Sequence, residues 1–140
     1  MQDTIYHREI TEFFQFFSGW FDGTTPNIDE HYSRISCVIP HDSTYIGHDG
    51  KLIMANAFFM NHVRSAHGSI PKLHMQAKNI QLQWENGGLA LVIFEEWSTA
   101  STPVPDGRIC SAIFRKNPNT PNGIEWLHFH ETLLPIEESQ

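Results

Sequence analysis

Residues 125–132 read EWLHFHET and form the last of four strand-like runs in the chain. Side chains of a β-strand alternate between its two faces. One face would carry Trp126, His128, His130 and Thr132, and the other would carry Leu127, Phe129, Glu131 and Leu133. Glu131 then lies in line with apolar side chains, where a carboxylate is costly to bury without a partner, a proton or a function. The stretch therefore predicts a pocket and leaves its chemistry open.

The three runs before this stretch show the same period of two, which is typical of strands with one buried face. The four runs span residues 73–84, 89–101, 108–117 and 124–134. Turn-forming segments rich in glycine, proline and asparagine separate them at residues 86–88, 103–107 and 118–123. The pattern predicts an antiparallel meander.

The residues before the meander have mainly helical patterns. Residues 4–21 carry large apolar side chains three and four apart, which predicts a helix with a broad apolar face. A short second helix is expected to bury Ile28, Tyr32 and Ile35. Residues 36–39 then suggest a strand before a loop at 40–50, and residues 51–67 suggest a third helix. Helices followed by a meander predict one α+β domain over residues 1–140, with a curved antiparallel sheet wrapped around the helices.

Composition argues against several classes of partner. The chain has 16 acidic and 9 basic side chains, with no basic cluster of the kind that phosphate backbones require, so no nucleic-acid partner is expected. It has no apolar run of membrane-spanning length and no signal-peptide pattern, so no membrane partner and a cytoplasmic location are expected. Cys37 and Cys110 lie in apolar runs, which is typical of buried free thiols.

The order of helices, short strand and long meander, closing on Trp126-Leu127-His128-Phe129-His130, resembles the nuclear-transport-factor-two-like superfamily. Within it, the last strand resembles that of the association domain of calcium/calmodulin-dependent protein kinase, which also has a Trp followed by His-Phe-His. The bacterial stand-alone and SnoaL-like members share this plan. The resemblance implies a cone-shaped, cystatin-like fold with a small-molecule cavity between the helices and the concave face of the sheet.

The resemblance also implies positions for site residues. Leu127, Phe129 and Glu131 would point into the cavity, and Trp126, His128 and His130 would lie on the convex face, where such folds form homodimers. Tyr32 matches a cavity tyrosine of the association domain. Phe94, Ala112 and Phe114 would complete the lining for an unknown small molecule. Arginines of the association domain fall at Glu131 and near Ala112, so the cavity here is expected to be neutral or acidic.

Glu131 is the first candidate for proton transfer, because loss of water disfavours the charged form of a carboxyl that faces an aromatic cavity. The alternative is a solvated glutamate at the cavity mouth, or one paired with Arg115. Only one of Glu95 and Glu96 can face inward, and the alternation through Phe94 favours Glu96.

No metal or other cofactor is expected. His128 and His130 have a chelating spacing, but double-barrel metal folds with that motif need a further histidine-bearing strand downstream. The motifs of nucleophilic catalysis and nucleotide binding are absent from the sequence.

Two functions remain open at this point. The first is a non-catalytic small-molecule-binding or scaffold protein with an apolar cavity. The alternative is a proton-transfer enzyme of the isomerase, cyclase or dehydratase type, with Glu131 or Glu96 as the base and Tyr32 as a hydrogen-bond donor. The fold by itself does not decide between them.

Overall fold

The computed structural model describes residues 4–100 and 107–135 of the chain. In chain order its elements are α1 (Ile5–Asp22), α2 (Asp29–Ser36), β1 (Thr44–Ile46), β2 (Leu52–Met54), α3 (Ala55–Phe58), the π-helical turn η1 (Phe59–Val63), the 3₁₀ turn η2 (Arg64–Ala66), β3 (His74–Asn86), β4 (Leu89–Thr99), β5 (Arg108–Lys116) and β6 (Ile124–Leu133). The predicted turn at residues 103–107 falls largely outside the described residues. No helix in the described ranges is long and apolar enough to cross a membrane.

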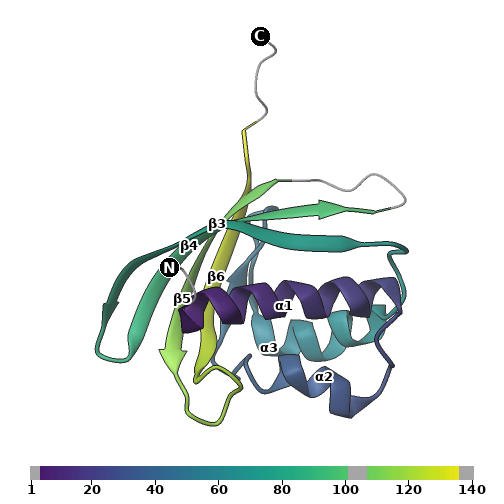
Figure 1. Ribbon diagram of the computed structural model, residues 1–140, viewed down its shortest axis with the longest axis horizontal. Coiled ribbons are helices and arrows are strands. Elements are labelled where there is room, and N and C mark those ends of the chain that lie inside the picture. The colour runs from purple at the N-terminus through teal and green to yellow at the C-terminus, as the bar shows by residue number, and fades with distance from the viewer. Residues whose placement is uncertain (1–3, 101–106, 136–140) are drawn as a thin grey trace.

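The strands form one six-stranded sheet in the order β2-β1-β6-β5-β4-β3. The long strands β3 to β6 pair antiparallel as a meander, whereas β1 pairs with β6 in parallel. Figure 1 shows the long strands curving over α1, with α2 and α3 on the same side of the sheet. The predicted α+β fold is confirmed, and the sheet is mixed where a purely antiparallel one was expected.

Helix α1 forms the centre of the core. The side chain of Thr4 caps its first turn by accepting a hydrogen bond from the backbone N–H of His7. Gly23 ends it in the left-handed conformation, with φ of 88°. The apolar spacing turns one face toward the sheet, and the buried residues on it are Tyr6, Ile10, Phe13, Phe14, Phe17 and Trp20.

The segment between α2 and β3 differs most from the predictions. Residues 36–39 form the end of α2 and a turn rather than a strand, and β1 lies inside the predicted loop at 40–50. Strand β2 occupies the start of the predicted third helix. Ile28 precedes α2 and is 45% exposed, not buried. Strands β1 and β2 have three residues each, which is too short for a recognisable alternation of apolar and polar side chains.

A β-bulge in β6 changes which side chains face the core. Phe114 pairs with Trp126 and Ile113 pairs with His128, so Leu127 is the extra residue. Trp126 therefore lies on the concave side, 1% exposed, with its ring 4.2 Å from that of Phe13. The expectation that Trp126 lies on the convex face with His128 and His130 was wrong, because one inserted residue reverses the alternation.

Glu9 is a fully buried carboxylate on α1. Its oxygens accept hydrogen bonds from Trp126 Nε1 at 2.9 Å, Arg34 Nη2 at 2.9 Å and Asn122 Nδ2 at 3.0 Å. These donors come from β6, α2 and the turn between β5 and β6. A buried charge is tolerated when it is paired and hydrogen-bonded in this way. The carboxylate thus joins α1 to three separate parts of the chain.

Glu9→Ala is expected to lower the free energy of unfolding by about 3 kcal/mol, because it leaves buried donors without an acceptor. Glu12→Ala is the matched control, since Glu12 also accepts from Arg34 and Asn122 while its side chain is 43% exposed. Glu12→Ala should lower the free energy of unfolding by about 1 kcal/mol or less. Urea unfolding of both variants measures the two losses, and equal losses would contradict the central role of Glu9.

Candidate ligand pocket

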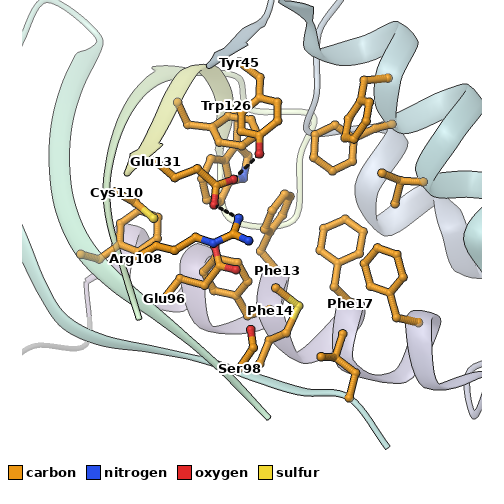
Figure 2. Close-up of a pocket in the computed structure, with 18 of the residues that line it drawn as sticks. Phe13, Phe14, Phe17, Tyr45, Glu96, Ser98, Arg108, Cys110, Trp126 and Glu131 are labelled. Atoms are coloured by element: carbon orange, nitrogen blue, oxygen red, sulfur yellow. Dashed lines mark hydrogen bonds and ion pairs between the residues drawn. The ribbon is translucent and has the colours of Figure 1, made fainter. Parts of the chain in front are cut away.

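A cavity of about 330 Å³ lies between the concave face of the sheet and the helices (Figure 2). Its wall is largely aromatic because α1 and β4 to β6 turn their apolar faces toward each other. The apolar lining consists of Phe13, Phe14, Phe17, Phe21, Phe58, Phe59, Val63, Ile70, Leu73, Met75, Phe94, Trp126 and Phe129. The remaining lining residues are Tyr45, Glu96, Ser98, Arg108, Cys110 and Glu131.

Glu131 lies on β6 and is 6% exposed. One of its carboxylate oxygens accepts a hydrogen bond from Tyr45 Oη, and the other accepts one from Arg108 Nη1, as the dashed lines in Figure 2 show. Strand β1 brings Tyr45 to this place, where its ring stacks on Phe129 at 4.4 Å. Burial and the charge of Glu131 raise the pKa of Tyr45 well above its ordinary value, so the phenol remains a donor.

Glu96 lies on β4, opposite Arg108 on β5. Its carboxyl makes no hydrogen bond or ion pair with any residue in the described ranges. Burial and the nearby charge of Glu131 raise the pKa of Glu96 to about 7, although Arg108 acts in the opposite direction. Near neutral pH this carboxyl can therefore either donate or accept a proton.

The inward register of β4 is the one predicted. Glu96 lines the cavity, and Glu95 lies on the other face, where its carboxylate accepts from Asn79 and from the indole of Trp97. Phe94 and Phe129 also line the cavity, as the alternation indicated. The roles of Glu96 and Glu131 toward a ligand stay predictions.

Four other predicted site residues lie away from the cavity. Tyr32 is buried behind its wall, where its hydroxyl donates to the carbonyl of Phe59 at 2.6 Å. Ala112 and Phe114 are fully covered by the core and do not reach the cavity surface. Leu127 occupies the bulge, so it does not follow Phe129 and Glu131 inward.

Two important pocket residues, Arg108 and Tyr45, were not predicted. Arg108 lines the cavity and pairs with Glu131. Arg115, one of the alternatives considered for Glu131, binds Asp42 and Glu125 instead. Arg108 could have been found, because it continues the inward alternation of Ala112 and Cys110 along β5. Tyr45 carries no such signal, since it lies in a three-residue strand inside a loop-like segment.

Glu96, Cys110 and Glu131 have ligand-type atoms within 4.8 Å of one another. They do not fit a divalent metal, because Arg108 already supplies a cation to Glu131. Burial and the charges of the two glutamates also raise the pKa of the Cys110 thiol far above its ordinary value, which disfavours the thiolate that metals bind.

The sequence predicted that both cysteines are buried. Cys110 is buried, but Cys37 is exposed.

No protein-family model and no curated protein sequence matches this chain. Solved structures do match it. An NTF-2-like protein of unknown function from Pseudomonas aeruginosa is 16% identical, with a TM-score of 0.76 over 94% of this chain and 99% of that one. A proposed ketosteroid isomerase from Shewanella frigidimarina is 14% identical, with a TM-score of 0.63 over 93% and 96% of the two chains.

A third solved structure is a proposed calcium/calmodulin-dependent kinase II association domain from Exiguobacterium sibiricum. It is 11% identical to this chain, with a TM-score of 0.57 over 98% of this chain and 99% of that one. At these identities the likeness concerns the fold, and the cavity residues have to carry any argument about function.

Glu96→Gln is expected to change how stability depends on pH. The fold raises the pKa of Glu96 from 4.5 to about 7, so between these values the unfolded chain loses the proton before the folded chain does. The wild-type free energy of unfolding, minus that of the variant, should therefore fall as pH rises through this window and then level off. Denaturant unfolding across the window measures the difference, and Glu95→Gln, on the other face of β4, is the control. A flat difference for Glu96→Gln would contradict this account.

Proposed function

We propose that this chain, which has the nuclear-transport-factor-two-like fold, is a small-molecule-binding protein. The proposal is carried by one observation, an aromatic cavity of about 330 Å³ that holds the partly buried carboxyl of Glu96, which has no hydrogen-bonding partner among the described residues. This volume is at the small end of the range for ligand sites, about 300–1,000 Å³. An apolar body would displace water from the phenylalanine wall, and one polar group would meet Glu96.

The polar side of the cavity supports binding more than chemistry. Both carboxylate oxygens of Glu131 already accept hydrogen bonds, so this residue acts in the proposal as part of the wall. Arg108 and Tyr45 hold it there. Glu96 is then the group that forms a hydrogen bond or ion pair with the polar group of the ligand. A pocket with few, convergent polar groups gives a ligand one orientation.

A proton-transfer enzyme of the isomerase, cyclase or dehydratase type is the second candidate function. The observation in its favour is the pKa of Glu96, raised to about 7, which suits a general base near neutral pH. The Shewanella structure described as a proposed isomerase is consistent with this candidate. Tyr32 cannot serve as the donor because it lies behind the cavity wall, so Arg108 or Tyr45 would have to polarise the substrate.

The proposal includes a homodimer formed through the convex face of the sheet. A cross-strand row there joins Trp84 to Leu91 and Ile113, and Trp84 is 46% exposed. An exposed apolar row of this kind is typical of a contact surface. His128 and His130 remain on this face, and Trp126 no longer contributes to it. Two of the similar solved structures are association domains, which supports self-association.

A fragment screen by thermal shift tests the binding proposal. Neutral or cationic fragments with an apolar body should raise the melting temperature of the wild type, because a ligand that binds only the folded state stabilises it. Ser98→Phe should remove the shift by filling the cavity that Ser98 lines. Ser111→Phe is the matched control on the convex face of β5. Shifts that survive in Ser98→Phe would place the binding elsewhere.

The same fragments separate the two candidate functions. Any hit with an acidic C–H next to a carbonyl is assayed for turnover with the wild type and with Glu96→Gln. A binding protein shows no turnover above solvent. An enzyme that uses Glu96 as its base loses about a hundredfold or more in rate in the variant.

The dimer should have twice the 16.1 kDa mass of the chain in light scattering. Trp84→Glu and Ile113→Glu should each shift the mass toward that of a monomer, because they put charges into an apolar contact. Glu85→Gln, which changes a residue next to Trp84 without adding charge, is the control. A wild-type monomer at micromolar concentration would contradict the proposal.

A further inference from the structure

We propose that the ligand of the cavity is a cationic amine with an apolar, preferably aromatic or alkyl, body. The inference rests on the proposed function, that the cavity binds a small molecule, and it names the chemical class of that molecule. It follows from the charges that face the cavity and from the nature of its wall.

The charged groups that line the cavity in the described ranges are Glu96, Arg108 and Glu131. Arg108 and Glu131 form an ion pair, so their charges largely cancel within the lumen. Glu96 is left as the carboxyl without a partner. When it is ionised the cavity has a net charge of one negative unit, and a monovalent cation restores neutrality.

Ligands of other classes match the charges of the cavity less well. A carboxylate or phosphate would meet two glutamates, and the arginine that could attract it is already paired. A neutral molecule would be compatible with protonated Glu96, but it would leave the ionised form buried and unpaired, which is costly. An ammonium group pairs with that form directly. Because folding has already removed much of the water from Glu96, part of the desolvation cost of a buried ion pair is met before the ligand arrives.

The wall favours a cation as well. Ten of the 19 described residues that line the cavity are aromatic. Aromatic faces attract ammonium groups, an effect that strengthens where water is excluded. Phe94 lies two residues before Glu96 on the same face of β4, and its ring is 5.9 Å from that of Phe14. An ammonium group at Glu96 therefore lies beside aromatic rings, and the apolar body of the ligand extends along α1.

Binding of an amine should be linked to the protonation of Glu96. The titratable groups that face it are Arg108 and Cys110 from β5, Glu131 from β6 and Tyr45 from β1. Burial and charge raise the pKa values of Cys110 and Tyr45 beyond the neutral range. Burial lowers the pKa of Arg108, but the hydrogen bond to Glu131 and the charges of Glu131 and Glu96 together outweigh it and raise that pKa. The pKa of Glu96, about 7, lies between pH 6 and 8. Since the amine pairs with the ionised form, its affinity should rise over that range.

The test uses 4-phenylbutylamine, 4-phenylbutanol and 4-phenylbutyrate, which share a body and differ in the polar group. NMR titrations of the full chain at pH 6 and pH 8 give each dissociation constant. The amine stays protonated throughout, because an alkylamine titrates near the lysine value of about 10.4. It should bind most tightly of the three at pH 8, and about tenfold more tightly there than at pH 6. The alcohol should show no such gain.

Variants separate the charge of Glu96 from its shape. Glu96→Gln should lose both the preference for the amine and its pH dependence, whereas Glu95→Gln, on the other face of β4, should keep both. Glu96→Asp retains a carboxylate and should keep the preference. It serves as the second variant if Glu96→Gln does not give the NMR spectrum of a folded chain.

The outcomes distinguish this inference from the proposed function. An alcohol that binds at the cavity at least as tightly as the amine at pH 8 overturns the amine inference and leaves a small-molecule site. Equal amine affinity in the wild type and Glu96→Gln, or in Glu96→Asp and a Glu96→Ala variant, also overturns it. If none of the three compounds shifts signals of the cavity residues, both proposals fail.

Discussion

The buried carboxylate of Glu9 is the constraint on which the arrangement of the core depends. A carboxylate with no exposure needs several donors, and those it has come from α2, from the turn before β6 and from Trp126. The bulge at Leu127 lets the indole of Trp126 reach Glu9 while Glu131 still faces the cavity. In a regular strand these two side chains would lie on opposite faces. The buried carboxylate of Glu9 on α1 is thus satisfied through the bulge in β6, which places both Trp126 and Glu131 on the concave side of the sheet.

The long strands could be predicted from the sequence to within about two residues, because their period of two and their turns are local features. The faces of β6 could not be predicted around Trp126. A bulge depends on how β5 and β6 pair, and that information lies in two segments at once. Strand β1 was missed for a different reason, since three residues are too short to show an alternation, although β1 pairs with both β2 and β6.

The cavity residues also divide into those that the sequence predicted and those that it did not. Glu96, Phe94, Phe129 and Glu131 were found because they belong to long strands with clear alternation. Arg108 follows the same alternation on β5 but was not predicted, because the resemblance implied arginines at other positions, Glu131 and near Ala112. Tyr32 was the tyrosine expected at the cavity, but Tyr45 lies there instead. Tyr32 closes a hydrogen bond behind the wall, and Tyr45, carried by the missed strand, reaches Glu131.

The two carboxyls of the cavity have different environments because only one of them has donors. Arg108 and Tyr45 bind Glu131, so its charge is fixed within the wall, and that charge in turn raises the pKa of Glu96 across the lumen. If Glu131 were neutral, Arg108 would be free to pair with Glu96, since the two lie directly across from each other on neighbouring strands. Glu131 therefore keeps Glu96 without a partner in two ways, by occupying the arginine and by repelling the second negative charge. An unpaired carboxyl that can change its charge near neutral pH is the group available to pair with a polar group of the ligand that we propose.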